Sequence, residues 1–132
     1  MAAPVVADIR NLLDQLAAKQ VTSNTITANI ADAFIYINRY ADPLADADEK
    51  DYAQKRIAVW LSYISYAEGQ SFQHGATPLF SQDKANSYRD IAELALNFVS
   101  MEPVDLEDIR RTNRDDKKAG LPNITFTGTS AF

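Results

Sequence analysis

The sequence predicts an all-α protein: a compact bundle of about four helices over residues 1–100, then a charged linker and an extended C-terminal arm over residues 101–132. In four segments apolar residues recur at spacings of three and four, as in helices with one buried face. The 4 Gly and 5 Pro of the 132 residues lie at or beyond the ends of these segments. Near the C-terminus apolar residues alternate instead with polar ones, a pattern typical of a strand. A chain of this length can bury a sizeable core as one domain.

The composition excludes several classes of function. No cysteine is present, so disulfides, thiol chemistry and cysteine-ligated zinc are ruled out. The net charge of −5 argues against general nucleic-acid binding, which needs clustered Lys and Arg. The N-terminus lacks the basic flank and apolar run of a secretory signal, and the most apolar run, residues 57–67, is too short to span a bilayer. We therefore expect a soluble protein made in the cytosol.

Two helices are expected in the first forty residues. The first covers residues 4–19, with Pro4 in its first turn. Its apolar stripe comprises Ile9, Leu12, Leu13 and Leu16. Thr22 or Ser23 is the expected N-cap of the second helix, which should end near Tyr40 because Pro43 disfavours helical backbone just before it. The apolar stripe of this second helix comprises Ile26, Ile30, Ala33, Phe34 and Ile37.

The acidic stretch DPLADADEKD, residues 42–51, raises the question of a metal site. A calcium loop counted from Asp46 would need a Gly at its sixth position and a Glu at its twelfth, where this chain has Asp51 and Ile57. Acidic residues are also favoured at a helix N-terminus by the helix dipole. We therefore expect a helix to start here, and we expect no metal and no cofactor.

The third helix, about residues 48–69, is apolar on two sides, and Gly69 is expected to end it. Its first apolar face comprises Ile57, Trp60, Leu61, Ile64 and Ala67. Its second face comprises Tyr52, Val59, Tyr63 and Tyr66. Such a helix is either central in its own domain or packed against another subunit. Tyrosine suits an interface, so the second face is the candidate subunit interface.

A loop containing His74, Gly75 and Pro78 is expected next, and Ser81 should cap a fourth helix that ends near Ser100. The residues expected to face inward from this helix are Tyr88, Ile91, Ala92, Ala95, Phe98 and Val99. After it, a short helical piece can form over residues 106–111 at most.

Enzyme motifs are poorly represented in the sequence. The single histidine, His74, has no nucleophile motif beside it, and the four scattered glycines form no phosphate-binding loop. Spacing alone brings no two carboxylates into one cleft. We therefore predict a protein that is not an enzyme and has no catalytic residues.

A cluster rich in basic residues follows the acidic stretch EPVDLED, residues 102–108. It is either a solvated linker or a docking segment that meets a charged partner. The basic residues of this segment are Arg110, Arg111, Arg114, Lys117 and Lys118.

The final stretch NITFTGTSAF has strong β propensity, and a single strand needs an edge with which to pair. The rest of the chain predicts no second strand, so this end is either disordered or an arm that adds to another molecule. We favour the arm, because a disordered tail seldom carries this much apolar surface. The residues expected to grip the partner are Leu121, Ile124, Phe126 and Phe132.

The succession of helices is similar to that of head–tail connector, or adaptor, proteins of tailed bacteriophages. In VTSNTITANIADAFIYINRY a Val-Thr start precedes a helix with matching landmarks. The helix YAQKRIAVWLSYISYAEG, the following break and a fourth helix ending in ALNFVS come in the same order, so the resemblance covers roughly residues 5–100. The landmarks of the second helix are Ile26, Ile30, Ala33, Ile37 and Tyr40.

This resemblance implies a structural protein of the virion, located in the neck between capsid and tail. Such subunits form a ring, commonly twelvefold, below the portal protein, and they dock the stopper or tail-completion protein. The ring continues the DNA channel without binding DNA specifically, and the C-terminal segments typically reach into the portal. Each subunit of a ring needs two different adhesive faces. The tyrosine face, and the Ile35 and Leu94 sides of their helices, are the candidates.

A second hypothesis keeps the fold and changes the function. The chain would then be a small helical binding or regulatory module whose C-terminal tail docks on one protein target. An adaptor assembles as many copies in a ring, whereas a regulator binds its target at low stoichiometry.

Overall fold

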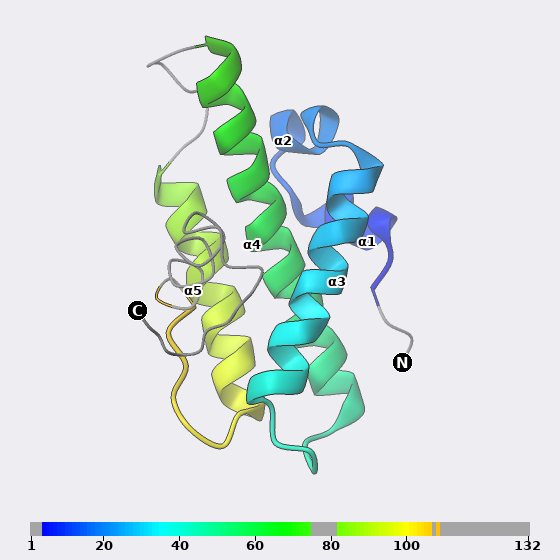
Figure 1. The fold of residues 1–132 in the computed structure, drawn as a ribbon, viewed down its shortest axis with the longest axis vertical. Helices are drawn as coiled ribbons and strands as arrows, with labels where there is room; N and C mark the ends of the chain where they lie inside the picture. Colours follow the sequence, from blue (N-terminus) through cyan, green and yellow to red (C-terminus); the bar gives the residue numbers. More distant parts are fainter. Residues whose placement is uncertain (1–3, 75–81, 107, 109–132) are drawn as a thin grey trace, which may run out of the picture.

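The computed structural model describes residues 4–74, 82–106 and 108, and the described chain is all-α, as predicted. It forms five helices: α1 (Val6–Leu12), α2 (Gln15–Gln20), α3 (Ser23–Tyr40), α4 (Ala47–His74) and α5 (Gln82–Val99). α4 lies in the middle of the bundle and packs against each of the other four helices. Figure 1 shows α3 and α5 on either side of α4, both running antiparallel to it.

The first predicted helix is wrong, because residues 4–19 form two helices. At Leu13 the backbone is extended (φ −81°, ψ 152°), and Asp14 caps α2 by accepting from the N–H of Leu16 at 3.3 Å. The backbone N–H of Asp14 donates to the hydroxyl of Tyr88 on α5 at 2.8 Å, a bond that replaces the one a continued helix would make. As a result Leu16 is exposed, and Ala17 occupies the buried position instead.

Helix α3 confirms its predicted ends. Thr22 is the N-cap, accepting from the N–H of Thr25 at 3.1 Å, and the helix stops at Tyr40. Phe34 is half exposed rather than inward, so that part of the predicted stripe is wrong. The side that faces the core is formed by Ile26, Asn29, Ala33, Tyr36 and Ile37.

The side-chain amide of Asn29 is tolerated in the core because it has hydrogen-bond partners on α4. The Nδ2 of Asn29 donates to the hydroxyl of Ser62 at 3.1 Å and to that of Ser65 at 3.3 Å. Eight residues before Ser62 on α4, the Nε2 of Gln54 donates to the backbone carbonyl of Ile30 at 3.1 Å. Buried polar groups that are hydrogen-bonded in this way fix how the two helices are aligned.

Helix α4 starts where the acidic stretch predicts it, and the carboxylate of Asp46 accepts from the N–H of Glu49 at 3.2 Å. It then runs 28 residues, past Gly69 to His74, so the predicted stop at Gly69 is wrong and His74 belongs to the helix. The rest of the predicted loop, residues 75–81, lies outside the described residues. A single glycine inside a helix costs only about 1 kcal/mol relative to alanine. Within the described residues no group of three His, Cys, Asp or Glu side chains is placed to hold a metal, and no helix is long and apolar enough to cross a membrane.

The buried side of α5 differs from the predicted one. Phe98 is largely exposed and Ile91 is 40% exposed, whereas Leu96, outside the predicted set, is fully buried. Tyr88 is half-buried, and the predicted cap Ser81 lies outside the described residues. The core side of this helix is formed by Ala85, Ala92, Ala95, Leu96 and Val99.

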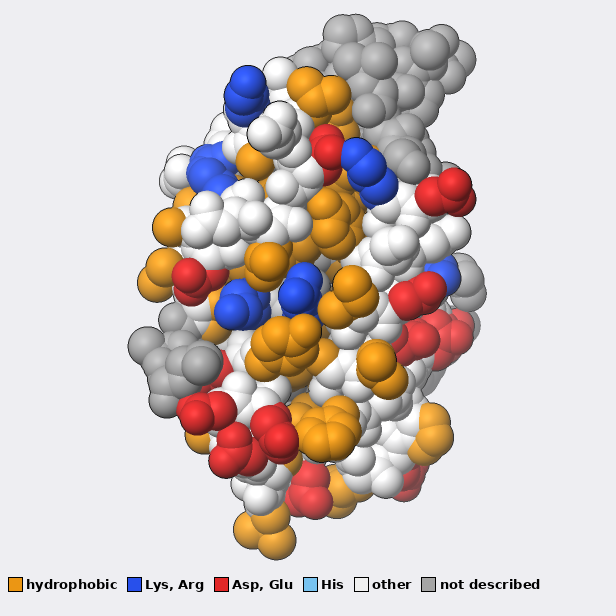
Figure 2. Space-filling model, turned by 180° about the vertical axis from the view of Figure 1, so that it is seen from behind, with side chains coloured by type: hydrophobic (Ala, Val, Ile, Leu, Met, Phe, Trp, Pro, Cys, Tyr) orange, Lys and Arg blue, Asp and Glu red, His pale blue; other side chains and the backbone are white. Residues whose placement is uncertain are grey.

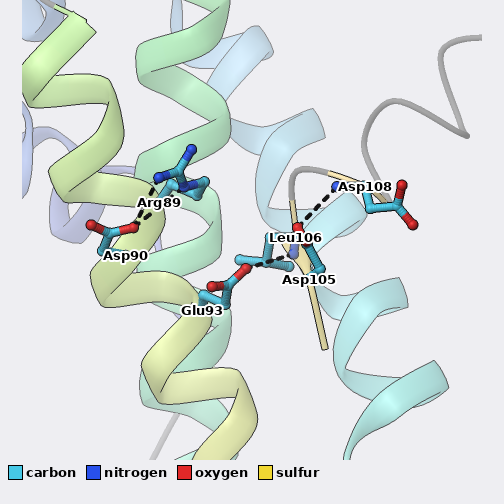
Figure 3. A network of polar contacts seen from close by, with 6 residues as sticks. All are labelled: Arg89, Asp90, Glu93, Asp105, Leu106 and Asp108. Carbon is cyan, nitrogen blue, oxygen red and sulfur yellow. Dashed lines mark hydrogen bonds and ion pairs between the residues drawn. The ribbon is translucent and has the colours of Figure 1, made fainter. Parts of the chain in front are cut away.

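The helical domain continues beyond the predicted boundary at residue 100. Leu106 is fully buried in the same core, and its backbone N–H donates to a carboxylate oxygen of Glu93 at 2.9 Å (Figure 3). The backbone of Val104 makes two bonds with the amide of Asn97: its N–H donates to Oδ1 at 2.6 Å and its carbonyl accepts from Nδ2 at 3.1 Å. Residues 101–106 thus belong to the folded domain and are not a free linker.

Candidate interaction surface

The predicted tyrosine interface lies largely inside the domain. Val59, Tyr63 and Tyr66 are buried, and the ring of Tyr63 lies 5.1 Å from that of Tyr88 on α5 and 5.6 Å from that of Tyr66. These three residues are therefore corrected from subunit contacts to core. Of the two explanations for a helix that is apolar on both sides, a central position in its own domain is confirmed.

Tyr52, the fourth residue of that face, is 43% exposed, but basic groups of its own helix cover its ring. The Lys55 ammonium lies 5.9 Å from the ring centroid and the Arg56 guanidinium lies 5.3 Å from it. The Nε of Arg56 also donates to the Tyr52 hydroxyl at 3.1 Å. This ring takes part in cation–π contacts within the subunit and is a poor apolar anchor for a neighbour.

The predicted arm and the predicted charged docking segment lie outside the described residues. Before them in the sequence, the N–H of Asp108 donates to the carboxylate of Asp105 at 3.1 Å (Figure 3). Both sets remain predictions from the sequence. The arm set is Leu121, Ile124, Phe126 and Phe132, and the charged set is Arg110, Arg111, Arg114, Lys117 and Lys118.

An apolar stripe on the outside of α5 is the main surface that sequence analysis missed as a whole. Leu94 and Phe98 are each 73% exposed and Met101, just past the helix end, is 69% exposed; with Ile91 they follow spacings of three, four and three. These four residues are called the α5 stripe. Together they leave on the order of 500 Å² in contact with water, near the upper end of what monomeric proteins expose in one patch.

Helix α3 carries an uncharged outer stripe of a different character. Its residues repeat at spacings of four and three, and all of them are exposed. Ile35, 50% exposed, is the one large apolar side chain among them, and the others are alanine or asparagine. This set is called the α3 stripe: Asn24, Ala28, Ala31, Ile35 and Asn38.

The helices that carry the two stripes, α3 and α5, lie on either side of α4 (Figure 1). The C-terminal ends of these helices are held level with each other. Ala41 and Ser100 form an antiparallel bridge, and the N–H of Asp42 donates to the carbonyl of Val99 at 2.8 Å. On the face seen in Figure 2, hydrophobic side chains are spread along the molecule, with acidic ones gathered toward its lower end.

The perturbed titratable groups lie elsewhere, where the α1–α2 corner meets α5. The Lys84 ammonium, which donates to Asp14, holds the pKa of that carboxyl below its ordinary value, and Asp14 in turn raises the pKa of Lys84. Burial raises the pKa of the Tyr88 and Tyr66 hydroxyls. Each of these groups bonds or packs between helices, so their arrangement serves to hold the corner together.

The Asp14–Lys84 pair predicts how stability changes with pH. The lowered pKa of Asp14 gives a contribution to the free energy of unfolding that is present above about pH 4 and is lost as the pH falls through the folded-state pKa. The raised pKa of Lys84 gives a second contribution to the free energy of unfolding, which is present below about pH 10 and is lost as the pH rises through the folded-state pKa. Asp14→Asn should therefore lower stability at pH 7 in urea denaturation, and the difference from wild type should shrink as the pH is lowered below 4. Asparagine can still cap Leu16, so a difference that stayed constant with pH would show that the charge is not the cause.

Comparison of the sequence with protein-family models and with characterised proteins, and of the fold with solved structures, gives no match.

Proposed function

We propose that this chain is a structural assembly protein, a head–tail connector subunit that forms a ring in the neck of a tailed-phage virion. The supporting observation is a bundle with a well-filled core that still exposes two uncharged stripes, one on α3 and one on α5. A closed ring repeats a single contact between two different surfaces, so each subunit needs two such faces. The sequence resemblance, which covers the same helices, supplies the location below the portal.

The net charge fits this role. A ring that continues a DNA channel must let the duplex slide, and a strongly basic lumen would bind its phosphates. The chain carries 18 acidic and 13 basic side chains, and 5 of the basic ones fall between residues 110 and 118. We assign that basic segment to contact with the portal or the stopper, and the residues after 118 to the arm that grips the portal.

The test is an affinity pull-down from a virus-producing lysate, with full-length protein and the 1–118 truncation side by side. The truncation keeps all of the described domain, so it should fold. Mass spectrometry should find a large portal-type protein with the full-length bait alone. A full-length double variant, Ile124→Asp with Phe126→Asp, is the control for chain length and should behave like the truncation.

Other outcomes separate the two hypotheses. Recovery of a single small cellular partner by the full-length bait would favour the regulatory module. Identical partners for full-length and truncated baits would contradict the assigned role of the arm.

A further inference from the structure

We propose that the α5 stripe of one copy packs lengthwise on the α3 stripe of the next copy, and that this head-to-tail contact builds the ring. The ring itself rests on the proposed function. The contact, by contrast, is a property of two copies of this chain and can be tested with purified protein.

The two stripes differ in the size of their side chains. The α5 stripe projects large side chains, Ile91, Leu94 and Phe98, from one side of its helix. The α3 stripe is built largely of small residues, and Ala28 and Ala31 precede Ile35 along it. Large residues of one helix that enter a channel between small residues of another give close helix packing. Both helices have 18 residues, about 27 Å; the α3 stripe covers residues 24–38 and the α5 stripe residues 91–101.

The stripes also match in register. Ala41 and Ser100 are bridged, so equal counts back along α3 and α5 reach the same height in the bundle. Ile35 and Leu94 each lie six residues before that pair, and Ala28 and Ser87 each lie thirteen residues before it. Rotation about a ring axis parallel to the helices moves a subunit sideways without changing its height. Leu94 of one copy therefore meets Ile35 of the next, one large apolar side chain against another.

Two further pairs fall within one residue of the same height. Ile91 lies nine residues before the bridge and Ala31 ten, whereas Phe98 lies two before it and Asn38 three. One residue corresponds to a rise of about 1.5 Å, which ordinary side-chain flexibility accommodates. Stripe residues of both helices are thus level over the C-terminal half of the contact, from Ala31 to Asn38 on α3 and from Ile91 to Phe98 on α5.

The alternative occupant of the α5 stripe is the α5 stripe of a second copy, and the cross-linking test below separates the two pairings. The α3 stripe contains no charged residue. The α5 stripe alone offers about 500 Å² of exposed surface to the contact. The residues that flank it bring the buried area closer to the roughly 800 Å² per partner of a standard specific interface.

The absence of cysteine from the chain makes disulfide cross-linking a clean test. Full-length Ile35→Cys and Leu94→Cys variants would be mixed one to one under mild oxidation, at concentrations from micromolar to millimolar. We expect a covalent heterodimer in the mixture and no dimer from either variant alone. A chain that carries both substitutions should give a ladder of covalent oligomers. All substituted positions are exposed, and circular dichroism would confirm that each variant folds.

Matched pairs test the register. Ala28→Cys mixed with Ser87→Cys is also in register and should cross-link. Ala28→Cys mixed with Leu94→Cys is displaced by seven residues, about 10 Å, and should not, because a disulfide needs Cα atoms within about 7 Å. Equal yields from both pairs would indicate random collision and would overturn the proposal.

The remaining outcomes are equally decisive. A Leu94→Cys dimer formed without its partner would mean symmetric pairing, and no cross-link at any concentration would mean that the stripes do not pack together. Recovery of a portal protein in the pull-down with failed cross-linking would keep the connector function and reject this contact. Specific cross-linking without portal recovery would keep the contact and reject the connector.

Discussion

A chain that ends at residue 100 is expected to be less stable than one that ends at residue 108, by about 3 kcal/mol or more in the free energy of unfolding. The shorter chain lacks Leu106, which is fully buried, and Val104, which packs against the core. It also leaves the Glu93 carboxylate and the Asn97 side chain without the backbone partners of residues 104–106. Urea denaturation followed by circular dichroism would measure the difference.

Point variants of the full-length chain separate the buried side chain from the chain length. Leu106→Ala should cost about 2–5 kcal/mol, the usual range for a buried leucine. Asp105→Ala removes only the exposed carboxylate that accepts from the Asp108 N–H, so about 1 kcal/mol is expected. Equal stability of the 100-residue and 108-residue chains would show that Leu106 does not contribute to the core in solution.

The elements that the sequence predicts well are those whose ends depend on neighbouring residues. The start of α3 follows from the Thr22 hydroxyl, and its end from Pro43 three residues beyond Tyr40. The start of α4 follows from the acidic residues that precede it. These signals act within one helical turn, so a single sequence contains them.

The break between α1 and α2 could not be predicted in this way. Its cause is a hydrogen bond from Asp14 to Tyr88, a residue 74 positions away. An aspartate inside an otherwise helical stretch is a weak sign of a new N-cap, and it was the only local signal. Tertiary contact decided the outcome.

The α5 stripe was missed in part because the size of an apolar side chain does not indicate whether it is buried on α5. This helix packs against α4 largely through Ala85, Ala92 and Ala95, and small residues let two helices approach closely. Leu94 and Phe98 then remain on the outside. Both sides of the helix are apolar, so its periodicity identifies two stripes without showing which one is buried.

The same ambiguity applies to α4, where Tyr63 lies on the second of two apolar sides. Tyr63→Ala is expected to cost about 3–5 kcal/mol in the free energy of unfolding, because a large buried ring is removed and a cavity is left between α4 and α5. Tyr52→Ala, on the same helix but exposed, should cost less than about 1 kcal/mol. Urea denaturation at low micromolar concentration, repeated at tenfold higher concentration, would make the comparison.

The dependence on concentration distinguishes a core residue from an interface residue. If Tyr63 lies in the core, the loss is the same at both concentrations, since it belongs to a single chain. If Tyr63 instead contacts a neighbouring subunit, the variant unfolds like wild type when dilute and differs only where copies associate. Tyr63→Phe keeps the ring and should recover most of the loss, because the ring supplies most of the buried area. Failure of phenylalanine to restore stability would place the effect in the hydroxyl rather than in packing between α4 and α5.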